Sequence, residues 1–393
     1  MAGERQRAGV LNRKIVIALN AAWNLVNFRA GLIRALVAEG YEVVAVAPPD
    51  AYASQLNALG CRYVPLHMDN MGTHPGRDML LLLRMGLILR RERPAVFLGY
   101  TIKPNVYGSL AAGLLGIPVI NNIAGLGSVF GKQGLLARLV QQLYRTALAR
   151  SARVFFQNED DKRLFIERKL VPQAIAKRIP GSGVDLVKFR YSERLTPAPQ
   201  SSTQALRFIL IARMLWEKGV GEFVEAARIV RQQYPFATFQ LLGFLDVQNP
   251  SAVSRAQVDK WVQEGVIQYL GTSDDVRVQL SNADCVVLPS YYREGVPRTL
   301  LEAAAMSRPI ITTDWIGCRE VVDDGVNGYL CEPKSAIDLA KKITSLIKLT
   351  PESRAEMGRQ GRLKVEREFD EQLVIQQYLR EIEDILSRSH PSN

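Results

Sequence analysis

Cysteine and histidine are scarce in this sequence, and neither forms a metal-binding pattern. Among 393 residues there are 4 cysteines and 3 histidines, and no two cysteines form a C-x-x-C pair. Thiols spaced this far apart predict neither a disulfide framework nor a zinc centre. The remaining composition, with 47% hydrophobic and 23% charged residues, excludes a disordered, collagen-like or coiled-coil chain. A chain of this length is expected to form two or three domains.

Two common nucleotide-binding loops are also missing. Residues 20–24, which follow the first predicted strand, read NAAWN rather than G-x-G-x-x-G. No G-x-x-x-x-G-K-[S/T] loop occurs anywhere in the sequence. These absences disfavour a nicotinamide dehydrogenase and a Walker-type ATPase.

The sequence has no long apolar run of the kind that crosses a membrane. Residues 104–131 carry no charge, but six glycines, two prolines and three asparagines argue against a membrane-spanning helix there. Residues 1–14 are polar and basic with no apolar core behind them, so no secretory signal is predicted. We therefore expect a cytoplasmic protein.

The net charge of +11 is concentrated in the N-terminal half of the chain. Residues 1–190 contain 26 basic and 12 acidic residues, a net charge of +14, whereas the remaining residues have a net charge of −3. A basic half favours an anionic partner, which is phosphate, nucleic acid or an anionic membrane surface. Nucleic acid is disfavoured, because aromatic residues are not interleaved with the basic ones and no binding motif occurs.

Short apolar runs alternate with helical patterns along both halves. The predicted strands are 15–19, 42–47, 95–99, 119–121, 154–157, 208–212, 238–242, 267–270, 285–288 and 310–313. The predicted helices are 28–39, 78–91, 105–115, 134–149, 222–233, 254–264, 299–306, 336–349 and 369–388. This alternation predicts an α/β fold with two Rossmann-like domains, each with a mainly parallel sheet. Residues 179–205, rich in proline and glycine, form a hinge-like connection, and ligands are expected at the carboxyl ends of the strands.

The densest chemical signal lies between the strand 285–288 and a helix predicted to begin at residue 298 or 299. The start of a helix presents N–H groups with partial positive charge, which suit a phosphate. Glu294 lies in the preceding loop, where its carboxylate could accept hydrogen bonds from sugar hydroxyls, and Glu302 lies one turn inside the helix. Taken alone, each glutamate fits a solvated surface acid better. The strand–loop–helix setting is what favours a ligand site.

The segment from Glu294 to Glu302, with the sequence GVP after the first glutamate, resembles the donor-site signature of retaining glycosyltransferases of family 4. The resemblance implies the GT-B fold, in which two Rossmann-like domains face each other across a cleft. Segment 211–219 resembles the family's diphosphate-binding segment, and segments 317–322 and 324–329 resemble the end of its donor domain. The implied divisions are an acceptor domain 1–185, a linker 186–205, a donor domain 206–368 and a helix 369–393 packing back toward the first domain.

The resemblance also implies roles for individual residues. Arg213 and Lys218 stabilise the departing diphosphate, Glu294 orients the sugar hydroxyls and Glu302 binds the ribose. The other implied donor-binding residues belong to the helix start: Gly295, Val296, Pro297, Arg298 and Thr299. Retention by front-face displacement is expected, because no covalent nucleophile is evident. No cofactor or metal is expected, since an Asp-x-Asp triplet is missing and the acidic pairs 160–161, 274–275 and 323–324 are predicted to be solvated.

Two segments of the first half resemble a narrower subgroup, the capsular-polysaccharide and PglA-type enzymes. These segments are 100–105, YTIKPN, and 121–130, NNIAGLGSVF. The subgroup adds an N-acetylhexosamine to a lipid-diphosphate-linked sugar. It implies a UDP-sugar donor, a polyprenyl-diphosphate-linked glycan acceptor and a peripheral position on the cytoplasmic face of the inner membrane. Segment 69–75, DNMGTHP, departs from the subgroup's pattern, which leaves the donor-sugar and acceptor preferences open.

The predicted acceptor-binding residues are Asn24, Arg29 and Lys103, which follow strands of the first half. Arg29 and Lys103 could pair with a lipid diphosphate, and the alternative is that both are ordinary surface residues. Segment 132–153 combines an apolar helical stripe with basic residues. It is predicted to bind an anionic membrane surface, although such a stripe also fits an ordinary core.

Two other functions stay open at this point. A sugar-nucleotide epimerase shares the GT-B fold, but it needs acid–base groups around the sugar C2, and no histidine lies near the donor motif. A non-catalytic sugar-nucleotide sensor is the second alternative. The intact set of Arg213, Lys218, Glu294 and Glu302 argues against it.

Overall fold

The computed structural model describes residues 12–69, 74–126, 135–191, 206–245 and 249–389. The chain divides into two compact units. Unit 1 comprises residues 1–124, 132–179 and 375–393, and unit 2 comprises residues 125–131 and 180–374. Residues 192–205, most of the predicted linker, lie outside the described residues. No helix in the described ranges is long and apolar enough to span a bilayer.

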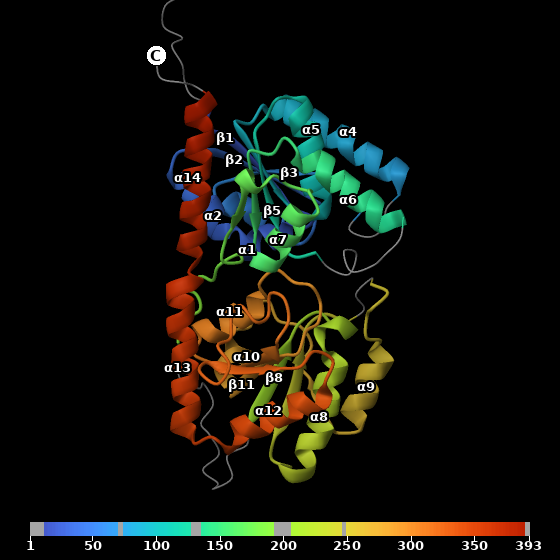
Figure 1. Cartoon of the computed structure of the whole chain (residues 1–393), viewed down its shortest axis with the longest axis vertical. Coiled ribbons are helices and arrows are strands. Elements are labelled where there is room, and N and C mark those ends of the chain that lie inside the picture. Colours follow the sequence, from blue (N-terminus) through green and yellow to red (C-terminus); the bar gives the residue numbers. More distant parts are fainter. Residues whose placement is uncertain (1–11, 70–73, 127–134, 192–205, 246–248, 390–393) are drawn as a thin grey trace, which may run out of the picture. The chain divides into compact units, whose positions relative to one another are not determined.

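Unit 1 is a parallel sheet surrounded by helices (Figure 1). Its strands are β1 (Lys14–Ala18), β2 (Glu42–Ala47), β3 (Arg62–Pro65), β4 (Val96–Tyr100), β5 (Val119–Ile123), β6 (Arg153–Phe156) and β7 (Ala176–Arg178). Its helices are α1 (Ala22–Phe28), α2 (Ala30–Ala38), α3 (Gln55–Ala58), α4 (Pro75–Glu92), η1 (Pro104–Gly108), α5 (Ser109–Leu114), α6 (Leu135–Leu148), α7 (Glu159–Glu167) and η2 (Gln173–Ile175). The last helix, α14 (Glu371–Ser389), begins in unit 2 and belongs to unit 1 from residue 375 onward.

The strand order of unit 1 marks where a ligand is expected. The order is β3-β2-β1-β4-β5-β6-β7, so the chain builds outward from β1 to β3 and then crosses back to β4. Strands β1 and β4 are parallel neighbours, with Ile15 opposite Val96. In open parallel sheets, ligands bind outside the carboxyl ends of the strands at such a reversal. In unit 1 this position follows Ala18 and Tyr100.

A network of buried amides lies in the middle of unit 1. The Asn121 side chain donates to the Ser109 hydroxyl at 2.8 Å and accepts from the Ser151 hydroxyl at 2.7 Å. The neighbouring Asn122 donates to the hydroxyl of Tyr378, on α14, at 2.9 Å. Buried polar groups are tolerated when they are hydrogen-bonded, so these contacts explain two asparagines on a fully buried strand.

Glu381 on α14 forms ion pairs with two strands of the sheet, β6 and β7. Its side chain is 7% exposed and accepts from Arg153 Nε at 2.6 Å and from Lys177. Burial raises the pKa of Glu381, but the two cations outweigh burial and hold that pKa below its ordinary value. The carboxylate therefore stabilises the fold above about pH 4.5 and loses this contribution as the pH falls through its lowered pKa.

We expect Glu381→Gln to lower the free energy of unfolding by about 3 kcal/mol at pH 7, because Arg153 is left buried without its carboxylate. Urea denaturation should show a gap between variant and wild type that is constant from pH 7 to about pH 5 and narrows below that. The exposed Glu383, on the same helix, supplies the control Glu383→Gln, with a change below about 0.5 kcal/mol. A gap that does not change with pH would contradict this role for the carboxylate.

Unit 2 repeats the same architecture. Its strands are β8 (Arg207–Ile211), β9 (Thr238–Leu242), β10 (Gln268–Tyr269), β11 (Cys285–Leu288), β12 (Ile310–Thr313) and β13 (Gly328–Cys331). Its helices are η3 (Trp216–Lys218), α8 (Val220–Gln233), α9 (Arg255–Gln263), α10 (Arg277–Asn282), α11 (Arg298–Ala305), α12 (Ala336–Lys348) and α13 (Pro351–Glu368). The strands are parallel in the order β10-β9-β8-β11-β12-β13, which puts the reversal of this sheet between β8 and β11.

The fold class predicted from the sequence is confirmed, and the differences are local. The predicted helix 28–39 corresponds to α2, which begins two residues later, at Ala30, and the helix α1 before it was not predicted. Three short strands (β3, β7 and β13) and the helices α3, α7, α10 and α13 were not predicted either. The acidic pair 160–161 was predicted to be solvated, but Asp161 is fully buried and accepts from the Asn158 amide at 3.2 Å.

Candidate active site

The predicted donor residues of unit 2 lie at the reversal of its sheet. Arg213 and Lys218 follow β8, and the loop 289–297 with α11 follows β11. These two strands are adjacent, with Phe208 opposite Cys285, so both segments start from the same edge. The Thr299 hydroxyl donates to the carbonyl of Ile211 at 3.2 Å. That bond fixes the first turn of α11 beside the carboxyl end of β8.

The structure brings Arg213, Lys218 and Glu294 together. Lys218 Nζ lies 2.6 Å from Glu294 Oε1, and the two side chains are 11% and 13% exposed. Lys218 also lies over the ring of Tyr292, 5.5 Å from its centroid. Burial raises the pKa of Tyr292, and Arg213, which is hydrogen-bonded to this side chain, partly offsets the increase. Tyr292 thus connects both cations of the cluster.

The carboxylate of Glu294 is held by its own loop as well as by Lys218. The Ser290 hydroxyl, fully buried, donates to Glu294 Oε1 at 2.8 Å. The carbonyl of Glu217 accepts from the N–H groups of Tyr291 and Tyr292 at 2.9 and 3.0 Å, which ties the loop to η3. Ser290 and Tyr292 were not predicted as site residues, although both stand inside the segment that carries the family signature.

Close backbone approaches surround the turn at Gly295, and glycines make them possible. Gly125 pairs with Glu294 in an antiparallel bridge, and a Cβ on Gly125 would come within 2.6 Å of Gly295 N. On the other side, a Cβ on Gly317 would come within 1.9 Å of Gly295 O. Both glycines have positive φ, 105° and 82°. Residues with side chains rarely adopt that conformation, so the turn depends on glycine at these two positions.

The turn also sets the start of α11. Gly295, Val296 and Pro297 are buried, and Pro297 is the extended residue before the first helical residue, Arg298. The helix thus begins at one of the two positions predicted for it. Its first-turn N–H groups stand next to the carboxyl end of β8, an arrangement that favours an anion.

Glu302 belongs to a second group of charges in unit 2. Its carboxylate lies 3.2 Å from Arg298 Nε, and both side chains are 13% exposed. Burial raises the pKa of Glu302 above its ordinary value; Arg298 and Lys188 lower it, and Asp275 raises it further.

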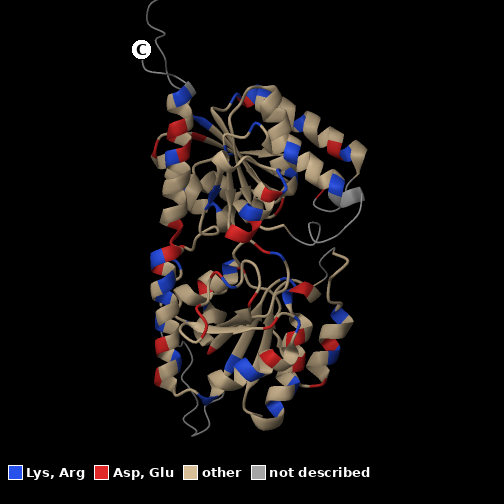
Figure 2. Cartoon of the chain, viewed as in Figure 1, with Lys and Arg blue, Asp and Glu red and all other residues tan. Residues whose placement is uncertain are grey.

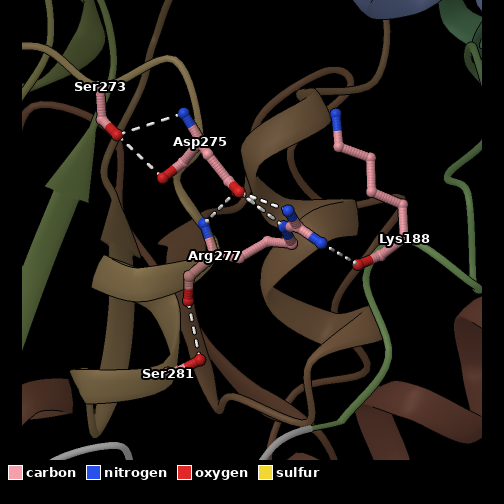
Figure 3. A network of polar contacts seen from close by, with 5 residues as sticks. All are labelled: Lys188, Ser273, Asp275, Arg277 and Ser281. Atoms are coloured by element: carbon pink, nitrogen blue, oxygen red, sulfur yellow. Dashed lines mark hydrogen bonds and ion pairs between the residues drawn. The ribbon is translucent and has the colours of Figure 1, made fainter.

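Figure 3 shows the neighbouring contacts of Lys188 and Asp275. The Asp275 carboxylate accepts from Arg277 Nε at 2.8 Å, and Arg277 Nη1 donates to the carbonyl of Lys188 at 3.4 Å. The Lys188 ammonium extends away from this pair. The network joins the backbone at Lys188 to the loop after β10. It thereby holds in place Lys188 and Asp275, two of the charges that act on Glu302.

The predicted acceptor residues of unit 1 follow β1 and β4. Asn24 is inside α1, and its amide donates to Asn20 Oδ1 at 2.9 Å. Lys103 pairs with the buried Asp78 at 2.7 Å, so its charge is already neutralised. Arg29 is 6% exposed, lies over the ring of Tyr100 and has no hydrogen-bond partner at Nε among the described residues. Of the three, Arg29 is therefore the residue best suited to take an anionic ligand.

Comparison with known proteins identifies both halves. Residues 193–364 match the family of glycosyl transferases group 1, and residues 27–181 match the glycosyl transferase 4-like domain. The segments with Arg213, Lys218, Glu294 and Glu302 fall inside the first match, and Arg29 and Lys103 inside the second.

Relatives of known activity and solved structures agree with these matches. The N,N'-diacetylbacillosaminyl-diphospho-undecaprenol alpha-1,3-N-acetylgalactosaminyltransferase of Campylobacter jejuni is 28% identical over 372 residues, covering 92% of this chain and 96% of the relative. An Escherichia coli UDP-Gal:alpha-D-GlcNAc-diphosphoundecaprenol alpha-1,3-galactosyltransferase is 25% identical, covering 70% of this chain and 71% of the relative. Among solved structures, Anabaena HepE in complex with UDP-glucose superposes with a TM-score of 0.73 at 18% identity, covering 95% of this chain and 99% of that one. The chain therefore belongs to the glycosyltransferases of group 1, family 4, with the GT-B fold.

Proposed function

We propose that this glycosyltransferase transfers an N-acetylhexosamine from a UDP-sugar to a polyprenyl-diphosphate-linked glycan at a membrane surface, with retention of configuration. The observation that carries the donor side is the cluster of Lys218, Glu294 and Arg213 at the sheet reversal of unit 2. The acceptor class rests on the Campylobacter jejuni and Escherichia coli relatives, whose names specify diphospho-undecaprenol acceptors.

The cluster provides what breaking a sugar–diphosphate bond requires. Negative charge grows on the departing diphosphate, and cations that are already in position stabilise this charge more in the transition state than in the ground state. We assign this task to Lys218, Arg213 and the N–H groups at the start of α11. Lys218 has three N–H donors, so it can hold Glu294 and still donate to a phosphate oxygen.

Glu294 and Glu302 are assigned to the neutral parts of the donor. Glu294 Oε1 is taken by Lys218 and Ser290, which fixes the carboxylate so that it can accept from sugar hydroxyls. Glu302 is assigned to the ribose. The proposed step is a front-face displacement. The acceptor oxygen bonds to the anomeric carbon as the carbon–diphosphate bond breaks, and the acceptor proton passes to the departing phosphate oxygen. A glycosyl-enzyme detected by intact mass would contradict this route.

On the acceptor side, we assign the lipid diphosphate to Arg29. Among the described residues Arg29 forms no ion pair with a carboxylate, which leaves its charge available for a charge-assisted hydrogen bond to a phosphate oxygen.

The test is transfer of radiolabelled sugar from UDP-GlcNAc and from UDP-GalNAc into organic-extractable lipid, with bacterial membranes and EDTA present. We expect label in the lipid phase from one of the two donors, which also identifies the sugar. Label that appears only when Mg²⁺ replaces EDTA would contradict metal independence. Conversion of the sugar nucleotide without any acceptor would contradict transfer and indicate an epimerase, and binding without turnover would indicate a sensor.

A further inference from the structure

The outer face of α4 is apolar, and nothing in the described part of unit 1 covers it. This 18-residue helix packs on the sheet through Leu81, Met85 and Leu89. On its opposite side, large apolar side chains recur at helical spacing and are exposed: Met79 57%, Leu80 44%, Leu83 58% and Leu87 68%. A surface helix of a globular protein normally has charged or polar residues there.

The charges of α4 are divided between the same two sides. Its acids point inward, where Asp78 pairs with Lys103 and Glu92 pairs with Lys14 and Arg62. Its arginines are exposed, and three of them have no carboxylate partner among the described residues: Arg84, Arg90 and Arg91. Figure 2 shows the basic positions of α4 in blue. The outer face is therefore both apolar and cationic.

This combination distinguishes α4 from α6, the helix within the segment predicted to bind membranes. On α6, Leu139 is exposed, but Tyr144 and Leu148 are buried, and Tyr144 packs against Phe165. Lys132 and the side chains of Leu135 and Leu136 lie outside the described residues. The part of the α6 stripe that the structure describes thus runs from the exposed Leu139 through the half-buried Val140 and Leu143 to the buried Tyr144.

The apolar face of α4 continues into a pocket at the carboxyl edge of the unit 1 sheet. Leu80 and Arg84 line this pocket, of about 370 Å³, together with Pro48, His67 and Lys103. Those three residues come from the loops after β2, β3 and β4. The outer face of α4 and the edge of the sheet where an acceptor is expected are therefore continuous.

We propose that the outer face of α4 docks unit 1 onto an anionic lipid bilayer, with Leu83 and Leu87 in the headgroup–acyl boundary and Arg84, Arg90 and Arg91 on anionic headgroups. Long arginine side chains can keep their charge at the interface while neighbouring leucines are buried. Two copies of this face would bring like charges together, whereas anionic lipid complements both its apolar and its cationic parts. The inference rests on the proposed function only in that a polyprenyl-linked acceptor explains why the enzyme needs a bilayer.

The test is sedimentation of the full-length protein with vesicles of POPC alone and of POPC with POPG at a ratio of 3:1. We expect binding to the POPG vesicles, and at least a tenfold weaker partition for Leu83→Glu/Leu87→Glu. The matched control is Ile337→Glu, an exposed apolar residue of unit 2, which should bind within twofold of wild type. The triple variant Arg84→Gln/Arg90→Gln/Arg91→Gln should bind the POPG vesicles more weakly, by about fivefold per arginine. The salt dependence of its vesicle binding should also be shallower than that of wild type.

Other outcomes would overturn the proposal. If the double glutamate variant binds as well as wild type, α4 is not the docking face. If wild type is a dimer by gel filtration that this variant converts to a monomer without a change in vesicle binding, a second copy covers the face. Transfer to a short-chain, detergent-solubilised acceptor separates the two proposals. We expect the double variant to retain transfer activity toward this acceptor. If wild type also shows no transfer to it, the proposed function is contradicted, whereas vesicle binding is not.

Discussion

Replacing Glu294 with glutamine is expected to lower kcat for sugar transfer by about 10²–10³-fold. Glutamine keeps the size of the side chain but removes the negative charge that pairs with Lys218 at 2.6 Å. It also gives up one oxygen acceptor for a sugar hydroxyl. The measurement is initial rate against UDP-sugar concentration, with kcat and KM separated, because a loss confined to KM would indicate ground-state binding only.

The control for this prediction is Glu332→Gln, an exposed acid of the same unit, which should keep wild-type kinetics. Thermal unfolding of both variants should be measured in parallel, so that a misfolded Glu294→Gln protein is not read as an inactive one. If the Glu294→Gln enzyme keeps kcat within threefold of wild type, Glu294 has no catalytic role.

Arg213 and Lys218 should give similar losses of activity but different losses of stability. Removing one positioned donor to the departing diphosphate is expected to cost about 10²-fold or more in kcat for either Arg213→Gln or Lys218→Met. Lys218 is buried against Glu294, so its removal leaves a nearly buried carboxylate unpaired and should lower the free energy of unfolding by about 3 kcal/mol. Arg213 is exposed, so its removal should change that free energy by less than about 0.5 kcal/mol.

Both losses can be read from one pair of experiments: steady-state kinetics, and urea denaturation of the same preparations. Arg359→Gln, at an exposed position of α13, serves as the control for removing a surface guanidinium. Equal stability of the Arg213 and Lys218 variants would show that the Lys218–Glu294 contact contributes nothing to the fold. An unchanged kcat in both variants would show that the diphosphate does not bind at this edge of the sheet.

The central strands were predictable because they are buried on both faces and read as continuous apolar runs, as in β2 and β11. The strands that were missed, β3, β7 and β13, lie at sheet edges and have only three or four residues, some of them polar. Too few apolar positions remain in such strands for periodicity to be visible. Between α1 and α2, the backbone of Arg29 leaves the helical conformation (φ −132°, ψ 5°). No pattern in the sequence indicates this break.

The donor residues could be predicted because their chemistry is concentrated in short segments, 213–218 and 294–302. What surrounds them could not, because the partners are distant in sequence. Gly125 meets Glu294 across the fold, and Glu302 shares its surroundings with Lys188 and Asp275. The same limit applies to Lys103, whose ion pair with Asp78 depends on the packing of α4 and not on any local pattern.

The position of α14 in the chain has a consequence for biosynthesis. Tyr378 completes the amide network around Asn122, and Glu381 neutralises Arg153, yet both lie on α14, which follows every strand of both units in the sequence. All six strands of unit 2 are synthesised before Tyr378 and Glu381. Unit 2 can therefore form its hydrophobic core before the part of α14 that completes unit 1 has been made. On the ribosome, unit 1 is therefore begun before unit 2 but completed after it.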